Sequence, residues 1–136
     1  MKLLSVDYGR RRIGIAVTDE EGRFVRGLNS IDRKKCTDSH QQILKIIADE
    51  NIKMIVFGLP LNDMDEETTM SKEVRGFASE IEKQCGLPVH FVDESFTSRR
   101  AAELMMFRKK KARRDKGLTD RIAACLILET FLELSS

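Results

Sequence analysis

Residues 53–61, KMIVFGLPL, are a nearly unbroken apolar run, and they limit the fold more strongly than any other feature of the chain. Such a run is typical of a central strand buried on both faces, and Pro60 closes it. A strand buried on both faces belongs to a sheet that helices cover on both sides. The run therefore predicts an α/β fold, and the length of 136 residues predicts a single domain, residues 1–136.

Shorter patterned segments surround this run. Apolar alternation predicts strands, and apolar residues three or four apart predict helices. Asp38 with Gln41 three residues later is a capping-box-like helix start, and Gly86 followed by Pro88 is a helix stop. In chain order, the predicted elements are strands at 3–7, 13–17 and 23–31, a helix at 38–50, a strand at 53–61, a helix at 65–85, a strand at 88–93 and helices at 97–107 and 118–134.

This order predicts a five-stranded mixed sheet flanked by helices. The first three strands are expected to form an antiparallel meander, and the strands at 53–61 and 88–93 to follow through right-handed crossovers. Ligands of open α/β sheets gather at the carboxyl ends of the parallel strands. The residues at those ends are therefore the first candidates for function.

The composition is that of a globular chain, 41% hydrophobic and 34% charged, which argues against a disordered or a membrane protein. The first residues, KLLSVD, show no signal-peptide pattern, and nowhere do 18 apolar residues run together. We therefore expect a cytoplasmic protein with no membrane partner. Cys36, Cys85 and Cys125 are too widely spaced for a CxxC metal pair, and we expect free thiols.

Positive charge is concentrated in one basic segment, residues 99–116. It holds nine Lys or Arg against only Glu103 and Asp115, so it carries +7, and because the whole chain carries +2 the remainder sums to −5. A basic block in an otherwise acidic domain favours phosphate binding. The alternative is an exposed loop with no partner, since like-charge runs are often only solvated.

Four acids stand at the ends of the predicted elements. Asp7 ends the first strand, Asp93 and Glu94 end the last one, and Asp120 begins the last helix. Clustered carboxylates repel one another unless a cation lies between them, and oxygen ligands without His or Cys suit Mg²⁺ or Mn²⁺. A pair of such ions can activate water and stabilise the leaving oxygen at a phosphodiester. The acids fit that chemistry without requiring it.

Each acid also has a purely structural interpretation. Asp7 could cap the turn at Gly9, and Asp120 could be a helix N-terminal acid that the macrodipole favours. Of Asp93 and Glu94, one points inward and one outward, because neighbouring strand residues face opposite sides. Position in the sequence does not decide which.

Four segments of the chain resemble the motifs of one known family. VDYGRRRIGIAV, VFGLPLN, FVDESFTSRRA and KGLTDRIAACLILETFL occur in the order and spacing of the YqgF/RuvX family, the Holliday-junction-resolvase-like proteins also described as candidate pre-16S ribosomal RNA nucleases. The resemblance covers nearly the whole chain. It implies a ribonuclease H-like fold, a cytoplasmic monomer or homodimer, and action on nucleic acid with a divalent metal.

By motif position, the catalytic acids of the family fall on Asp7, Glu94 and Asp120. They belong to the acids named above as candidate ligands of Mg²⁺ or Mn²⁺, and we expect Asp93, the fourth of those acids, to support them at the metal. The other matching motif positions hold Arg12, Thr97, Gly9, Gly14 and Gly58. The residues expected on nucleic acid are Arg12 and members of the basic segment, namely Arg99, Arg100, Lys109, Lys110, Lys111, Arg113, Arg114 and Lys116.

The chain departs from the family pattern in two places. Ser95 stands where the family usually has an arginine. The loop after VFGLPLN reads DMDEETTM, without the glycine that the family commonly carries there. Both departures concern placement of the substrate more than the metal chemistry.

The first hypothesis is therefore a metal-dependent endonuclease that processes the 5′ end of pre-16S rRNA. A Holliday junction resolvase acting on branched DNA would use the same acids, and a non-cleaving nucleic-acid or transcription-complex binding module could keep them as structural ligands. An actin-like ATPase or sugar kinase also begins with Asp-x-Gly, but those enzymes close two lobes on ATP and 136 residues supply one. Only the resemblance favours RNA over branched DNA.

Overall fold

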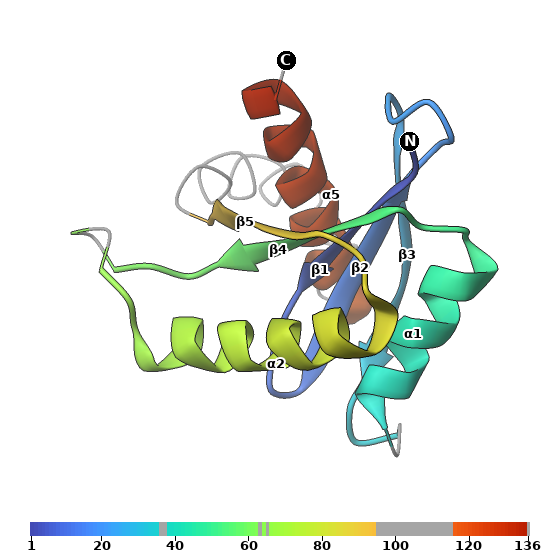
Figure 1. Ribbon diagram of the computed structural model, residues 1–136. Helices are drawn as coiled ribbons and strands as arrows, with labels where there is room; N and C mark the ends of the chain where they lie inside the picture. Colours follow the sequence, from blue (N-terminus) through green and yellow to red (C-terminus); the bar gives the residue numbers. More distant parts are fainter. Residues whose placement is uncertain (36–37, 63, 65, 95–115, 136) are drawn as a thin grey trace.

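The computed structural model describes residues 1–35, 38–62, 64, 66–94 and 116–135. At its centre is a five-stranded sheet in the order β3-β2-β1-β4-β5 (Figure 1). The strands are β1 (Leu3–Asp7), β2 (Arg12–Thr18), β3 (Val25–Asp32), β4 (Met54–Leu59) and β5 (Val89–Asp93). The mixed five-stranded sheet predicted from the sequence is confirmed.

The strand directions bring three strand ends to one edge of the sheet. β1, β2 and β3 pair antiparallel, as the predicted meander, whereas β1, β4 and β5 run parallel to one another. Ile55 to Leu59 of β4 are all buried, which confirms the prediction of a central strand covered on both faces. The carboxyl ends of the three parallel strands carry Asp7, Leu59 and Asp93.

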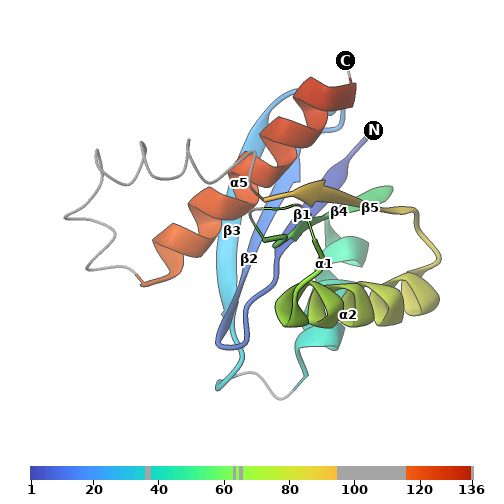
Figure 2. The ribbon, with the colours of Figure 1, turned by 90° about the vertical axis from the view of Figure 1, so that its left-hand side faces the viewer.

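Helices cover both faces of the sheet. α1 (Ser39–Asp49) and α2 (Thr69–Cys85) pack on one face, and α5 (Lys116–Ser135) crosses the other (Figures 1 and 2). Because strand side chains alternate, the apolar residues form two cores. The larger one, under α1 and α2, contains Val6 and Phe57, and the smaller one, under α5, contains Leu3, Val56 and Val92.

Capping residues decide where α1 and α2 begin. α1 starts after Asp38, as predicted, because the Asp38 carboxylate accepts backbone N–H bonds of the first turn. α2 starts at Thr69, four residues later than predicted, because Thr68 and Ser71 form a capping box. The residues just before it form a turn in which Asn62 accepts two backbone N–H bonds.

Three further expectations concern helices and thiols. The helix expected at 97–107 lies outside the described residues, as does Cys36. In the described ranges, no helix is both long enough and apolar enough to cross a membrane. Cys85 and Cys125 are free thiols, as predicted.

Candidate active site

Asp7 is the last residue of β1 and faces α5. Along β1, Leu3 belongs to the core under α5, and the Ser5 hydroxyl donates to the backbone carbonyl of Ala124 in α5 over 2.6 Å. Since strand side chains alternate, Asp7 faces the same helix. Its carboxyl group is therefore half-buried where the edge of the sheet meets α5.

Asp120 reaches this place because α5 lies directly against β2. A Cβ atom added to Gly14 would stand 2.1 Å from the backbone oxygen of Asp120, so only glycine fits there. Gly14 is the register partner of Asp7 in the β1–β2 pair. α5 thus passes across the strand pair that carries Asp7, as Figure 2 shows.

Glu94 reaches the same face from the end of β5. Its backbone N–H donates to the Leu59 carbonyl over 3.1 Å, and a Cβ atom added to Gly58 would lie 2.7 Å from Glu94 Oε1. Val92 belongs to the core under α5, and alternation then turns Asp93 toward the opposite face. Glu94 is thus the inward-facing acid of the pair, which position in the sequence left open.

The three carboxyl groups act on one another electrostatically. Burial raises the pKa of Asp7 well above its usual 3.8, and a hydrogen bond with Glu94 and the negative charges of Glu94 and Asp120 raise it further. A hydrogen bond between two carboxyl groups requires a proton between them. A cation that replaced this proton would relieve the same repulsion.

Arg12 pairs with Asp120. Its Nε donates to Asp120 Oδ2 over 2.9 Å, and both side chains are only partly exposed. The prediction that Arg12 contacts nucleic acid stays a prediction, and the structure adds that its guanidinium group binds a candidate metal ligand. The ion pair therefore fixes the orientation of Asp120 at the edge of the acidic cluster.

The donor set fits a hard divalent cation, because it consists of carboxylate oxygens from three separate elements. In the part of the chain that the structure describes, no three Asp, Glu, His or Cys side chains are grouped so that they could hold a metal ion as they stand. As they stand, Asp7 shares a hydrogen bond with Glu94, and Asp120 forms an ion pair with Arg12. A bound cation would exchange these contacts for its own.

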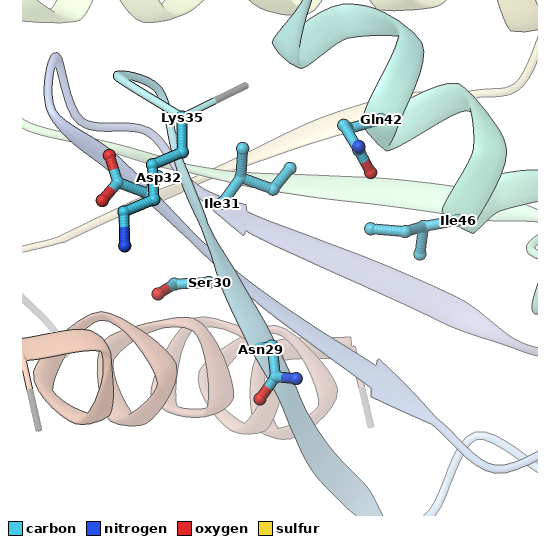
Figure 3. A pocket seen from close by; sticks show the side chains of 7 residues that line it. All are labelled: Asn29, Ser30, Ile31, Asp32, Lys35, Gln42 and Ile46. Carbon is cyan, nitrogen blue, oxygen red and sulfur yellow. The ribbon is translucent and has the colours of Figure 1, made fainter. Parts of the chain in front are cut away.

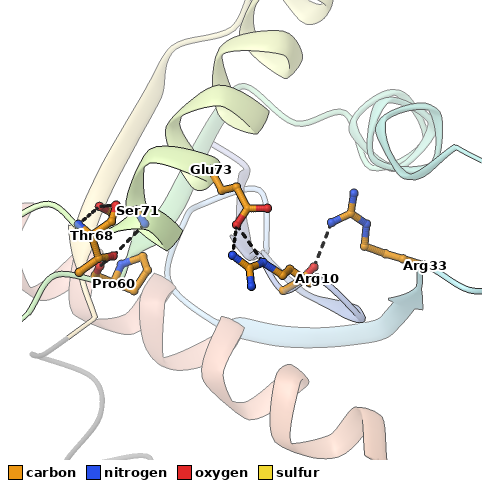
Figure 4. A network of polar contacts seen from close by, with 7 residues as sticks. Arg10, Arg33, Pro60, Thr68, Ser71 and Glu73 are labelled. Carbon is orange, nitrogen blue, oxygen red and sulfur yellow. Dashed lines mark hydrogen bonds and ion pairs between the residues drawn. The ribbon is translucent and has the colours of Figure 1, made fainter.

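The three consecutive arginines after Gly9 join the β1–β2 turn to three different elements. Arg10 binds Glu73 of α2 at 2.8 Å (Figure 4), and Arg11 lies 3.3 Å from Asp32 of β3. Arg12 binds α5, as described above. Sequence reasoning missed Glu73 and Asp32, and no local signal marks them, because they lie 63 and 21 residues from their partners.

Arg33 is a further residue that sequence reasoning missed. Its backbone N–H donates to the Arg11 carbonyl over 2.9 Å. Its Nη1 donates to the Gly9 carbonyl over 3.2 Å, which is the dashed line at Arg33 in Figure 4. The guanidinium carbon stands 5.1 Å from the ring centroid of Tyr8. The turn between Asp7 and Arg12 is therefore held by Arg33, which follows β3, as well as by the ion pairs of its own arginines.

Part of the predicted site lies outside the described residues. This part comprises Thr97, Ser95 and most of the basic segment, with Arg99, Arg100, Lys109, Lys110, Lys111, Arg113 and Arg114. Lys116 begins α5, but its side chain is not among those described. The predicted roles of these residues stay predictions.

Comparison with known proteins agrees with the motif resemblance. The model of the RuvX family, described as Holliday junction resolvase, matches residues 1–134. The chain belongs to the RuvX family. A RuvX relative from Koribacter versatilis is 36% identical over 132 residues, which cover 97% of this chain and 86% of the relative. Another, from Maridesulfovibrio salexigens, is 36% identical over 97% of this chain and 98% of its own. Both are named as candidate pre-16S rRNA nucleases.

Solved structures support the fold of this RuvX chain. RuvC of Thermus thermophilus in complex with a Holliday junction substrate superposes with a TM-score of 0.64 at 16% identity, covering 100% of this chain and 97% of RuvC. The fowlpox virus resolvase in complex with Holliday junction DNA gives 0.64 at 10% identity, covering 99% of each chain. These likenesses confirm the expected ribonuclease H-like fold. By family, the chain is an enzyme of the nuclease class.

Proposed function

We propose that this protein is a divalent-metal-dependent endonuclease that hydrolyses phosphodiester bonds at the 5′ end of pre-16S rRNA in the cytoplasm. The observation that carries the proposal is that three carboxyl groups converge at the carboxyl ends of the parallel strands, on the face that α5 covers. They belong to Asp7 at the end of β1, Glu94 just after β5 and Asp120 in α5. Three mutually repelling carboxyl groups in a half-buried position are costly unless they hold a cation.

Asp7, Glu94 and Asp120 are the residues that would hold Mg²⁺ or Mn²⁺. When bound there, the ion would activate a water molecule and stabilise the leaving oxygen. The protein itself supplies the orientation of the ligands: Arg12 directs the Asp120 carboxylate, and Gly14 lets α5 approach β2 closely. We assign Asp93, which faces away from α5, to support of the strand end rather than to direct binding of the ion.

The substrate assignment rests on the relatives. Relatives covering nearly the whole chain at 36% identity carry the name of pre-16S rRNA nucleases, whereas the junction-bound structures share the fold at 10 and 16% identity. The family description, Holliday junction resolvase, makes branched DNA the second candidate. A junction resolvase cuts two strands and needs two sites, so a homodimer in solution would favour branched DNA and a monomer would favour rRNA.

Cleavage assays test the proposal directly. Wild-type protein is incubated with a precursor 16S rRNA fragment, a four-way DNA junction and plain single strands, each with Mg²⁺ or Mn²⁺. We expect cleavage of the rRNA fragment, and a loss of at least about a hundredfold in rate for Asp7→Asn, the scale of removing an essential charge-stabilising group. Asp49→Asn, at an exposed position that ends α1, is the matched control and keeps the wild-type rate.

Two results would contradict the proposal. If no substrate is cut while binding to nucleic acid survives, the protein is a binding module. If the junction alone is cut, the substrate assignment falls and the nuclease assignment stands.

A further inference from the structure

We propose that two adjoining turns beside the acidic cluster bind the phosphate backbone of the substrate. The surface, called the basic ridge, consists of Arg10 and Arg11 in the β1–β2 turn and Arg33, Lys34 and Lys35 after β3. None of these residues belongs to the basic segment at 99–116. The inference rests on the proposed function, because the ridge is meant to position nucleic acid for that site.

The ridge is continuous with the acidic cluster. Arg12, which holds Asp120, directly follows Arg11 in the chain and is the register partner of Asp32 in the β2–β3 pair. Arg33 directly follows Asp32. A strand of nucleic acid that lies over the ridge is therefore led toward the carboxyl groups at the end of β1.

Hydrogen bonds hold the two turns together. The backbone N–H and the Nη1 of Arg33 both donate to carbonyl groups of the β1–β2 turn, at 2.9 and 3.2 Å. The backbone N–H of Lys34 donates to Asp32 Oδ1 and that of Lys35 to the Asp32 carbonyl, each over 3.0 Å. The backbone that carries the cations of the ridge is thus held in one conformation before nucleic acid binds, and this preorganisation lowers the entropy cost of binding.

Aromatic packing supports the ridge from below. The Arg33 guanidinium stands 5.1 Å from the centroid of the Tyr8 ring and 5.8 Å from that of Phe77 in α2. The Tyr8 and Phe77 rings lie 5.0 Å apart, and the His40 ring lies 4.2 Å from Phe77. Arg33 is therefore half-buried as a positioning residue, while the two lysines beside it remain exposed.

The charge of the ridge is positive even after its ion pairs are counted. Its five cations meet two acids, Glu73 at Arg10 and Asp32 at Arg11, which leaves +3. In the described ranges, neither Lys34 nor Lys35 forms an ion pair of its own within 4.0 Å. Exposed lysines on a preorganised turn are the usual donors to phosphate oxygens.

A cavity of mixed polar and apolar lining extends this surface along β3, the edge strand of the sheet. It has a volume of about 330 Å³ and lies between β3 and α1, with Asn29, Ser30 and Gln42 among its lining residues. Figure 3 shows Lys35 beside Asp32 at one end of the cavity and Asn29 further along β3. The Asn29 amide oxygen already accepts a hydrogen bond from Arg121 over 3.0 Å, so Ser30 and Gln42 are the polar residues of the lining that would give further hydrogen bonds to a sugar-phosphate backbone.

The salt dependence of binding tests the ridge. All proteins carry Asp7→Asn so that the substrate is not cut, and the probes are a fluorescein-labelled precursor 16S rRNA stem and a labelled four-way DNA junction. The test variant is Lys34→Gln/Lys35→Gln. The matched control is Lys53→Gln/Lys83→Gln, which removes the same charge from exposed lysines just before β4 and near the end of α2.

We expect the test variant to lower the slope of log K against log salt by about 1.4 to 1.8, because each phosphate that a lysine neutralises contributes about 0.7 to 0.9 to that slope. The control keeps the parent slope. The single variants Lys34→Gln and Lys35→Gln are each expected to give about half the change in slope. They are used for the measurement in place of the double variant if the double variant melts at a lower temperature than the Asp7→Asn parent.

Equal slopes for the test and control variants would contradict phosphate binding by the basic ridge. This result would leave the proposed cleavage activity of the wild-type protein standing. If the parent protein, which carries only Asp7→Asn, binds neither probe, the proposed role of the ridge and the proposed function are both contradicted. The probe that shows the larger change identifies the backbone, RNA or DNA, that the ridge contacts.

Discussion

At the scale of single residues, Asp7 sits in a position that opposes its own ionisation. Burial comes first among the causes, followed by Glu94 and Asp120. The same side chain both destabilises the metal-free protein and provides the charge that a cation needs. The carboxyl group of Asp7 therefore lowers the stability of the metal-free protein while the proposed activity requires it.

Asp7→Asn is expected to stabilise the metal-free protein. Because the folded pKa of Asp7 is raised above 3.8, the folded state keeps a proton that the unfolded state loses, so stability falls as pH rises through the interval between the two values. The advantage of Asp7→Asn over wild type should therefore grow as pH rises from about 4 toward neutral, by at most about 1.4 kcal/mol per pH unit. Urea unfolding in EDTA at several pH values measures it.

The exposed control Asp49→Asn should show no such growth with pH. A wild-type protein that is more stable than Asp7→Asn at neutral pH without metal would mean that the carboxyl groups are not in repulsion.

Arg12 shows why a motif position does not reveal its contact. Its place before Ile13 and Gly14 suggests a nucleic-acid role, but the residue it binds, Asp120, lies 108 positions away. The contact depends on how α5 crosses β2, which no local pattern encodes. A motif identifies the residue, and the packing of the helix identifies its partner.

At the scale of elements, the close crossing of α5 over β2 depends on Gly14 having no side chain. The backbone of α5 occupies the space where a Cβ of residue 14 would be. Strand patterning from Ile13 to Val17 predicted β2 correctly, including Gly14 as a small residue within it. Its reason, close approach of a helix backbone, became visible only with the helix in place.

Gly14→Ala should therefore move α5 away from β2 or strain the strand. We expect a loss of about 1 to 3 kcal/mol in the free energy of unfolding, the usual cost of overpacking, together with loss of cleavage because Asp120 is displaced. The matched control is Gly76→Ala in α2, where an added Cβ meets nothing within 4 Å and should gain about 0.5 to 1 kcal/mol. Equal stability of the two variants would contradict the close approach.

At the scale of the whole molecule, metal binding should couple the three elements that carry the carboxyl groups. A cation that binds only the folded state stabilises it by about 2.7 kcal/mol at a hundredfold excess over its Kd. We expect Mg²⁺ or Mn²⁺ to raise the thermal midpoint of the wild-type protein and to leave that of Asp7→Asn unchanged. Thermal melts with and without metal provide the measurement. An equal rise in both proteins would place the ion elsewhere.

The sequence by itself determined the sheet, most helix positions and the acids at the strand ends, because alternation, helical periodicity and caps act over a few neighbouring residues. Only the tertiary structure decided that Glu94 rather than Asp93 faces α5, that Arg12 binds Asp120, and that Arg33 joins two turns. These contacts join residues far apart in the chain. They depend on the register of strands and the path of a helix, which are fixed only when the whole molecule packs.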